Sequence, residues 1–497
     1  MRGSGSFWPD TAGVASLIAF ASIFHVLGML WLMFSGILML PVLIDWVTEE
    51  PFAEGFFEVA LVSAAFAGIV VLASRKRGPF VLRLREAFLL TTLSWVSLPA
   101  FAALPLMTYG ISFTDGYFEA MSGLTTTGST VLSGLDDMDP AILFWRALLQ
   151  WIGGIGIIVM AIVLLPFLRV GGMQLFRTES SDQFDKAVPR ASQLTGWIVA
   201  IYFALTFACV VAFMAFGMEA FDALCHAMAT LSTGGYSTHD ASFGHFREPG
   251  LHWAATLFMI AGALPFAAYI GVLHGRFDAM LRDTQIRGFI ALVLAICTLM
   301  TLWLWASGEH DFSEAARLVT FNIVSVITTT GFASTDYQLW GPFAFAVFFV
   351  VMFIGGCAGS TSGAIKIYRF QIIAKMIAAQ VRRLTSVHRV NVMTYAGKPV
   401  AADVPVSILA FVAIFLATIG LGTLLLAATG LDLLTALTAS ATAITNVGPG
   451  LGDVIGPAGN FSGLPDTAKW LLSAAMLLGR LELFTVLVLF NPSFWRG

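Results

Sequence analysis

The chain has 497 residues, of which 58% are hydrophobic and only 11% are charged. Ordinary soluble domains carry roughly 25% charged residues, so this composition excludes a soluble globular protein and indicates an integral membrane protein. The net charge of −4 points to no partner, and the scattered cysteines (Cys209, Cys225, Cys297 and Cys357) predict neither a disulfide nor a metal cluster.

Ten long apolar segments are predicted to cross the membrane, since each is long enough for ~30 Å of hydrocarbon. Two stand first, at about 14–45 and 55–74, and eight follow in pairs. The pairs are 87–108 with 141–168, 192–216 with 251–274, 288–307 with 341–378, and 404–428 with 468–490. Between the members of each pair lies an apolar segment too short to cross, at roughly 116–126, 219–232, 314–329 and 433–445. These four segments are predicted to enter the membrane and return.

The predicted fold class is therefore an all-α integral membrane protein. Four repeats, each a helix, a short pore helix and a second helix, surround a pseudo-fourfold pore, and two extra N-terminal transmembrane helices precede them. The predicted boundaries are 1–80 for the extra helices, then 81–178, 179–280, 281–395 (with an interrupted second helix) and 396–497 for the repeats.

The positions of the basic residues predict the orientation. Most of the 26 Lys and Arg residues lie in the loops between pairs, whereas acidic residues such as Asp136, Asp240 and Asp453 lie on the other side. By the positive-inside rule, the loops between pairs and both termini are cytoplasmic. The four short segments then open toward the outside, and their common orientation predicts an axis along the membrane normal.

Each short segment ends in a similar loop. The four loops are Thr125-Thr126-Thr127-Gly128, Leu231-Ser232-Thr233-Gly234, Thr328-Thr329-Thr330-Gly331 and Thr445-Asn446-Val447-Gly448, with 106, 97 and 117 residues between successive glycines. Glycine reaches positive φ without a Cβ clash, which lets successive carbonyls face one axis. A single such loop is usually an ordinary turn, but four in the same membrane context predict a ring of carbonyls that replaces the water around a potassium ion.

Two chemical details refine this prediction. The C-terminal ends of the short helices carry partial negative charge, which favours a cation, and the Thr and Ser hydroxyls offer further oxygen ligands. Each loop has one filter glycine, and the fourth departs from the others at Asn446 and Val447. We therefore expect fewer ion sites than in tetrameric potassium channels, which have Gly-x-Gly in each loop, and weaker discrimination among potassium, rubidium and sodium than in those channels.

The chain resembles the TrkH/TrkG/KtrB family of potassium transporters along nearly its whole length, and most closely its TrkH branch. The resemblance rests on the four loops, on Gln150–Gly156, on Gly171–Arg177 and on Gly355–Gly363. The two initial helices are also similar to TrkH proteins, since KtrB proteins lack them. The resemblance implies a multi-pass protein of the bacterial inner membrane that transports K⁺ and works as a homodimer docked on a cytosolic nucleotide-binding ring, TrkA.

The stretch Gly355-Gly356-Cys357-Ala358-Gly359-Ser360-Thr361-Ser362-Gly363 interrupts an apolar run. Its four glycines and three hydroxyl residues predict a break in the helix. The alternative is a kink that allows close packing. The resemblance implies a flexible loop beneath the filter that gates conduction, and Lys366 either contacts the pore mouth or lies at the membrane interface.

Arg480 lies near the middle of the last predicted span. An unpaired charge at that depth costs at least ~2.5 kcal/mol, so Arg480 must face protein or water. One interpretation is a structural pair with Glu482 or another acid. The resemblance implies instead that Arg480 lies in the pore below the filter, where its charge is a barrier to ions.

Other polar residues have structural interpretations. Glu119 and His226 on the short helices are predicted to be hydrogen-bonded anchors, and Arg146 and Arg317 to snorkel at the outer interface. His239, His245 and His252 show no ligand spacing that predicts a metal site.

The predicted function is potassium uptake, with regulation by a TrkA-like partner and without an organic cofactor or a nucleic-acid partner. The alternative is a sodium-permeable or sodium-coupled transporter. A membrane-embedded enzyme would need ionisable residues that converge at one depth, and the spans supply essentially Arg480 alone. Seven cations predict either a TrkA docking surface or simply a cytoplasmic loop: Lys366, Arg369, Lys375, Arg382, Arg383, Arg389 and Lys398.

Overall fold

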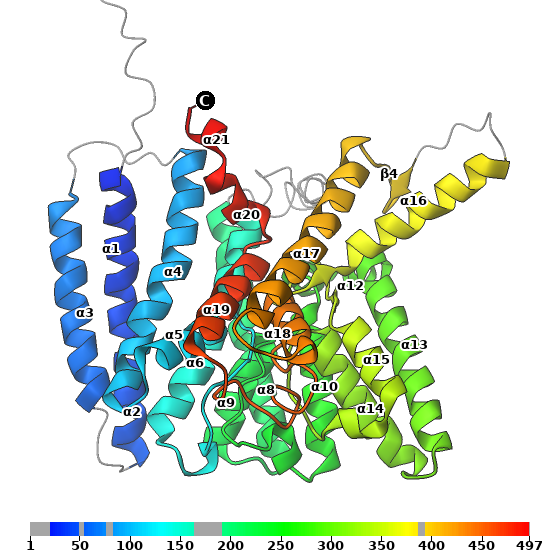
Figure 1. The fold of residues 1–497 in the computed structure, drawn as a ribbon, viewed down its shortest axis with the longest axis horizontal. Coiled ribbons are helices and arrows are strands. Elements are labelled where there is room, and N and C mark those ends of the chain that lie inside the picture. Colours follow the sequence, from blue (N-terminus) through cyan, green and yellow to red (C-terminus); the bar gives the residue numbers. More distant parts are fainter. Residues whose placement is uncertain (1–19, 49–53, 76–82, 164–190, 386–392, 497) are drawn as a thin grey trace, which may run out of the picture.

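The computed structural model describes residues 20–48, 54–75, 83–163, 191–385 and 393–496. Within these ranges the protein is mostly helical, with only two short two-stranded sheets (Figure 1). Seven of the described helices are long and apolar enough to cross a membrane, and nine do so if two bent helix pairs are counted as single spans. The prediction of an all-α membrane protein is confirmed. Gly171–Arg177 lies outside the described residues.

Three helices form the N-terminal part: α1 (Phe20–Ile37), α2 (Met39–Thr48) and α3 (Glu54–Ala73). They stand together at one side of the molecule (Figure 1, left). The indole of Trp31 donates a 2.9 Å hydrogen bond to Ser97 in α4 (Leu84–Thr108), and Phe34 and Phe56 both pack against Trp145 in α6 (Pro140–Val163). Because α1 continues into α2 as one candidate span, Phe20–Ile44, the three helices make two spans, and these contacts fix both spans against the rest of the protein.

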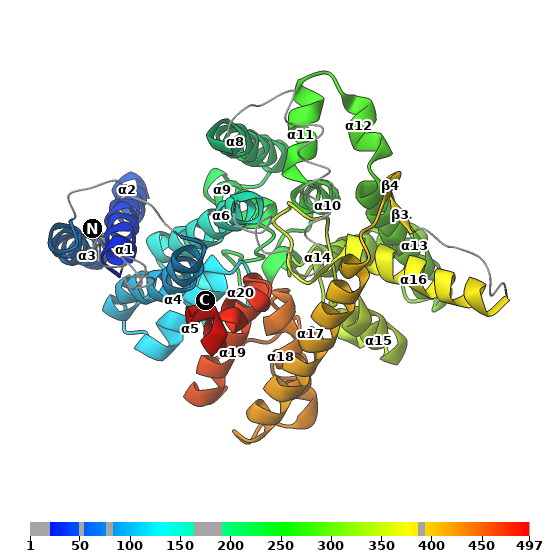
Figure 2. The ribbon, with the colours of Figure 1, turned by 90° about the horizontal axis from the view of Figure 1, so that it is seen from above.

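The remaining helices form four units, each with a short helix between two longer segments. The first has α4 (Leu84–Thr108), α5 (Phe113–Leu124) and α6 (Pro140–Val163), and the second has α8 (Ala191–Ala215), α9 (Ala220–Leu231), α10 (Pro249–Ala263) and α11 (Phe266–Leu273). The third has α12 (Phe277–Arg282), α13 (Thr284–Ala306), α14 (Phe312–Ile327), α15 (Pro342–Val351) and α16 (Ile367–Thr385). The fourth has α17 (Asp403–Ala427), α18 (Leu433–Thr445), α19 (Asp466–Arg480), α20 (Phe484–Leu487) and α21 (Pro492–Arg496). The units follow one another around a common centre (Figure 2).

The short helices α5, α9, α14 and α18 have 12, 12, 16 and 13 residues. At 1.5 Å per residue none reaches across ~30 Å of hydrocarbon. Three begin at a side-chain cap, because Ser112, Asp311 and Asp432 each accept a hydrogen bond from a backbone N–H of the first turn. Their last turns are buried, so the rest of the protein covers backbone that lipid could not accommodate.

Two predicted spans are broken rather than continuous. The segment 251–274 bends by 97° between α10 and α11, where Pro265 lacks the N–H that would continue the helix. The segment 468–490 bends by 103° after α19, where Glu482 and Leu483 both adopt positive φ. A third segment, 341–378, is helical only as far as Val351 and resumes at Ile367, and α16 is too polar to count as an apolar span.

The four cysteines are buried and unpaired. The short strands β1 (Ile354–Gly355) and β2 (Ile365–Lys366) pair in parallel and close the two ends of the interruption in the third unit. The antiparallel strands β3 (Thr394–Tyr395) and β4 (Lys398–Pro399) form a hairpin between α16 and α17. The interruption is therefore a compact loop whose ends are held together.

Candidate ion-conduction pathway

The loops that follow the four short helices contact one another in cyclic order. In each loop a glycine with positive φ packs so closely against a carbonyl oxygen of the next loop that an added β-carbon would lie only 1.9–2.7 Å from that oxygen. The glycine and carbonyl partners are, in order, Gly128 with Gly234, Gly235 with Thr330, Gly331 with Val447, and Gly448 with Thr127. The fourth loop thus returns to the first, and the four loops form a closed ring.

The backbone conformation shifts the second loop by one residue relative to the sequence pattern, which matches Gly234 with Gly128. Each loop has a non-glycine residue with φ of 51–60° two positions before its positive-φ glycine, namely Thr126, Thr233, Thr329 and Asn446. The equivalent of Gly128 is consequently Gly235, not Gly234, and Leu231 is the last residue of α9 rather than part of the loop. The sequence signals this ambiguity only by its doubled glycine, because either Gly234 or Gly235 could be matched with Gly128.

Hydroxyl groups line the start of each loop. Thr125, Thr328 and Thr445 donate hydrogen bonds of 2.7–2.8 Å to carbonyls one turn earlier in their short helices, and Ser232 donates similarly at 3.1 Å. A hydroxyl that donates in this way keeps its oxygen lone pairs for a cation. The four helix C-termini at the same place add partial negative charge. The chemistry of this end of the ring favours a cation.

A buried ion pair holds the first two loops. Arg146 donates from Nε to Glu119 at 2.8 Å and from Nη1 to the carbonyl of Ser237 at 2.8 Å. Glu119 also accepts from the Val131 amide. Glu119 is therefore a hydrogen-bonded anchor, as predicted. The prediction that Arg146 snorkels to the membrane interface is wrong, because Arg146 is only 1% exposed and binds Glu119.

His226 is anchored as predicted, through hydrogen bonds to the Asp222 carbonyl at 2.8 Å and the Ser237 hydroxyl at 2.9 Å. Gln150, one residue of the Gln150–Gly156 stretch, donates to the Gly234 carbonyl at 2.6 Å and accepts from the Tyr236 amide at 3.0 Å. Both side chains fix the backbone of the second loop from outside the ring.

Asn446 makes the fourth loop chemically different. Its side-chain amide donates to the Thr127 hydroxyl at 2.9 Å and to the Met476 carbonyl in α19 at 3.0 Å. Asn tolerates the left-handed conformation better than most residues. Asn446 therefore replaces a threonine while it ties the fourth loop to the first.

The stretch Gly355–Gly363 lies against the ends of three short helices. Thr361 Oγ1 donates to the carbonyl of Leu231 at 3.1 Å, the Gly363 amide donates to Thr329 Oγ1 at 2.6 Å, and the next amide, of Ala364, donates to the Thr445 carbonyl at 2.9 Å. The loop is thus bonded directly to the second, third and fourth units at the base of the ring.

The break in the second unit supplies further partners for this stretch. The Cys357 amide donates to the Ala263 carbonyl at 2.9 Å, Thr361 Oγ1 donates to the Gly262 carbonyl at 2.9 Å, and the Phe266 amide donates to the Gly359 carbonyl at 3.0 Å. These backbone groups would be satisfied within a continuous helix. The bend between α10 and α11 therefore creates the seat on which the loop rests.

Arg480 lines the same small pocket as Ser362, Gly363 and Lys366. Its side chain is 3% exposed, and its guanidinium nitrogens have no hydrogen-bond partner among the described residues. The suggested pair with Glu482 is not formed, because Glu482 binds Arg369 instead. Lys366 donates to the Ser362 carbonyl, so it contacts the loop and not the membrane interface.

Replacing Arg480 with Gln should speed cation flux. A monovalent ion that passes ~8 Å from a unit charge meets a barrier of about 2 kcal/mol at an effective dielectric constant of ~20. Removal of the charge is therefore expected to raise initial ⁸⁶Rb⁺ uptake into proteoliposomes roughly thirtyfold, since about 1.4 kcal/mol changes a rate tenfold. Arg317→Gln, in the first half of α14 and away from this pocket, is the matched control and should leave uptake unchanged. Loss of assembled R480Q protein on size-exclusion chromatography would indicate a structural role instead.

Helices that cross the membrane around four converging loops define the class of a membrane transport protein. The chain belongs to the TrkH family, because the family profile described as "TrkH: Cation transport protein" matches residues 54–496. The Trk system potassium uptake protein TrkI of Halomonas elongata is 46% identical over 494 residues, which cover 98% of this chain and 99% of that protein. The Trk system potassium uptake protein TrkH of Vibrio parahaemolyticus is 36% identical and covers 96% of this chain and 100% of its own length.

A solved structure agrees with this assignment. The crystal structure of the potassium transporter TrkH from Vibrio parahaemolyticus superimposes with a TM-score of 0.88 at 33% sequence identity, over 96% of this chain and 100% of that one. The predicted family is therefore confirmed.

Proposed function

We propose that this protein takes up K⁺ across the bacterial inner membrane through one pore per chain. The closed ring of glycine-to-carbonyl contacts is the observation that carries this proposal. The filter consists of Thr125–Gly128, Ser232–Gly235, Thr328–Gly331 and Thr445–Gly448, each from one of the four units bounded at 81–178, 179–280, 281–395 and 396–497. The relatives named as potassium uptake proteins support K⁺ as the transported ion.

The flux of ⁸⁶Rb⁺ into proteoliposomes tests this function. We expect purified protein to admit ⁸⁶Rb⁺, external K⁺ to compete strongly and Na⁺ to compete weakly, while protein-free vesicles remain tight. Equal competition by Na⁺ would favour the alternative, a sodium-permeable or sodium-coupled transporter. Absence of flux in the R480Q variant as well would contradict a conducting pore.

The loop Gly355–Gly363 and Arg480 form the proposed gate beneath this filter. The loop closes the base of the ring through its bonds to three units, and Arg480 adds a buried positive charge to the same pocket. To open the pore, the loop must break its hydrogen bonds to Leu231 and Thr329, and the adjoining bond from Ala364 to Thr445 must also break. This arrangement would let a signal from the cytoplasmic side control the filter without altering it.

The proposed orientation places the upper side of Figure 1 in the cytoplasm. The exposed Arg382 and Arg383 near the end of α16 lie on that side, as does α21 near the C-terminus. The positive-inside rule assigns such clusters to the cytoplasm. The N-terminus, also predicted to be cytoplasmic, lies outside the described residues.

The exposed cations after the gate are the proposed docking surface for a TrkA-like cytosolic ring, with the transporter as a homodimer. Lys375, Arg382, Arg383 and Lys398 are exposed, whereas Lys366 is partly buried and Arg369 is fully buried, so these last two are removed from the predicted surface. Arg389 lies outside the described residues. Because α16 continues directly from the gate, a partner bound there acts on the gate through one helix.

Reversing the charges of Arg382 and Arg383 to Glu should weaken capture of the purified TrkA-like regulator about tenfold in a pull-down at low salt. The control reverses two exposed cations of the neighbouring loop, Arg276 and Arg282, and should leave capture intact. Undiminished binding of the α16 variant would remove the docking role, and the basic residues would then serve only membrane topology.

A further inference from the structure

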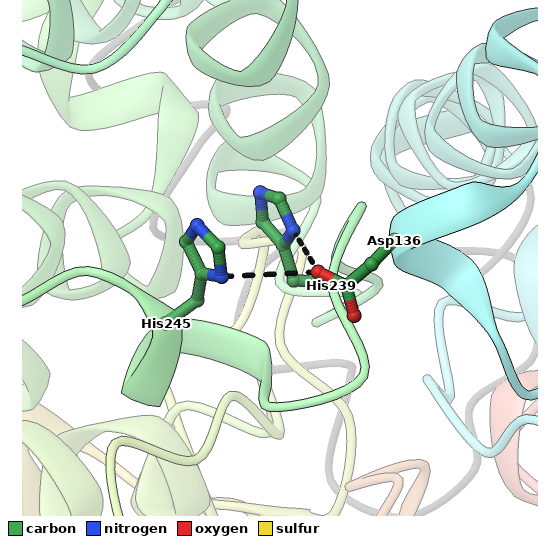
Figure 3. A group of neighbouring side chains, drawn as sticks. All are labelled: Asp136, His239 and His245. Atoms are coloured by element: carbon green, nitrogen blue, oxygen red, sulfur yellow. Dashed lines mark hydrogen bonds and ion pairs between the residues drawn. The ribbon is translucent and has the colours of Figure 1, made fainter.

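Two outer loops from different units meet around three side chains that the sequence did not connect. Asp136 lies in a short helical turn (Leu135–Asp137) after the first filter loop, and His239 and His245 follow the second (Figure 3). Asp240 fixes the junction: its carboxylate Oδ2 accepts from the amides of Gly134 and Leu135 at 2.9 and 3.2 Å, and its own amide donates to Oδ2 of Asp136 at 3.2 Å. The cluster therefore lies on a rigid seam between units one and two.

The three side chains point their ligand atoms at one place. Nδ1 of His239 lies 2.5 Å, and Nδ1 of His245 3.8 Å, from the same carboxylate oxygen of Asp136 (Figure 3). All three ligand atoms lie within 4.8 Å of one another. The imidazoles are stacked, with 3.5 Å between their centroids and an angle of 3° between their planes, so one ring must turn before both Nδ1 atoms can bind the same ion.

A second carboxylate orients His239 from behind. Nε2 of His239 lies 3.2 Å from Oδ2 of Asp222, and Oδ1 of Asp222 accepts from the Thr238 hydroxyl at 2.7 Å. An imidazole that donates from Nε2 presents a lone pair at Nδ1. This carboxylate–histidine arrangement is the one that outer partners of metal-bound histidines commonly make.

Two acceptors only 2.5 Å apart need a cation between them. Without a metal this cation is a proton: burial alone would lower the pKa of His239, but the hydrogen bonds with Asp222 and Asp136 outweigh burial and raise it. The hydrogen bond from His239 correspondingly lowers the pKa of Asp136. Two carboxylates, of Asp136 and Asp222, thus face the two ring nitrogens of His239.

We propose that Asp136, His239 and His245 bind one divalent transition-metal ion of the zinc type. Two imidazole nitrogens and one carboxylate suit zinc better than calcium or magnesium, which prefer oxygen ligands. Zinc bonds of ~2.0–2.2 Å in a tetrahedron separate the ligand atoms by roughly 3.3–3.5 Å, between the two distances observed here. His245 is 46% exposed, so it can rotate to this spacing and leave a fourth position to water.

The bound ion would join the outer loop of unit one to that of unit two beside the filter. This role is independent of which cation crosses the pore, so failure of the metal site would leave the proposed uptake function untouched. It predicts that zinc stabilises the folded protein, because a ligand that binds only the native state raises the melting temperature.

Isothermal titration of the full-length, chelator-stripped protein in detergent at mildly alkaline pH tests the site. Zn²⁺ should bind at one ion per chain, and Ca²⁺ should not compete. His245→Gln removes one ligand and should weaken binding at least about 100-fold, while Asp222→Asn, which removes the outer partner, should weaken it about 10- to 100-fold. His310→Gln is the matched control, because His310 pairs with Glu314 outside the cluster.

Melting curves supply the second measurement. In chelator, H245Q should melt at the wild-type temperature, because His245 is exposed and makes no hydrogen bond that holds the fold among those described. Zinc should then raise the melting temperature of the wild type and H310Q but not of H245Q. Equal zinc binding by wild type and H245Q, or no zinc binding by the wild type, would overturn the proposal and leave a proton as the only occupant.

Discussion

Replacing Gly235 with alanine should abolish selective ⁸⁶Rb⁺ uptake, with at least about a hundredfold loss. The new β-carbon would lie 1.9 Å from the Thr330 carbonyl, which belongs to the neighbouring loop. Backbone must move to relieve such a contact, and the carbonyl that moves is one of the proposed ion ligands. The measurement is initial uptake into proteoliposomes at matched protein content, with K⁺ and Na⁺ as competitors.

Two control variants separate the ring from general strain. Gly308 has φ of +79°, close to the +78° of Gly235, but a β-carbon added there would have no described atom within 4 Å, so Gly308→Ala should cost about 1–2 kcal/mol of stability and no flux. Gly234→Ala meets the Gln150 side chain rather than another loop and should be milder than Gly235→Ala. If Gly234→Ala reduced uptake more than Gly235→Ala, then Gly234, and not Gly235, would be the equivalent of Gly128.

If the loop Gly355–Gly363 is the gate, deletion of Ser360–Ser362 should raise basal ⁸⁶Rb⁺ flux at least roughly tenfold. The deletion removes the bond from Thr361 to the Leu231 carbonyl and pulls Gly363 away from Thr329. Each lost hydrogen bond is worth about 0.5–1.5 kcal/mol, and about 1.4 kcal/mol changes an equilibrium tenfold. Flux should increase without the regulator, and selectivity for K⁺ over Na⁺ should not change, since the filter stays intact.

A point variant tests the same contacts at unchanged loop length. Thr361→Val loses the side-chain bonds to Leu231 and Gly262 and should raise flux by less than the deletion. Thr418→Val in α17 also loses one hydroxyl bond, to Ile414, but lies away from the loop and should have wild-type flux. Wild-type flux in both the deletion and Thr361→Val would show that this loop does not limit conduction.

Much of the fold could be predicted because membrane crossing depends on apolar length, which the sequence displays directly. The break at Gly355–Gly363 was also predictable from its glycines and hydroxyl residues, but the two bends were not. Apolar residues continue across the first bend, and Pro265 alone signals it. The second bend falls at Arg480 and Glu482, whose charges do not by themselves specify a bend; Glu482 and Leu483 adopt positive φ, and Glu482 reaches Arg369, 113 residues away. A tertiary ion pair there overrides the helical preference of the segment.

The candidate site, like the fold, could be predicted only in part from the sequence. Small hydroxyl residues followed by glycine mark the four loops, but Gly234-Gly235 leaves the register open until the neighbouring loop is known. Arg146 looks like an interfacial cation until Glu119 is placed 2.8 Å away. Residues that act together from distant parts of the chain, such as Asp136 and His239, carry no signal in their spacing.

Anomalous diffraction from crystals grown in Tl⁺ or Rb⁺ measures the central claim most directly. If the four loops form one cation filter, anomalous density should lie on the axis enclosed by Gly128, Gly235, Gly331 and Gly448, and excess K⁺ should displace it. The Gly235→Ala crystal should lose this density while the protein remains folded. Density absent from this axis, or located only elsewhere in the protein, would contradict a shared ring of carbonyl ligands.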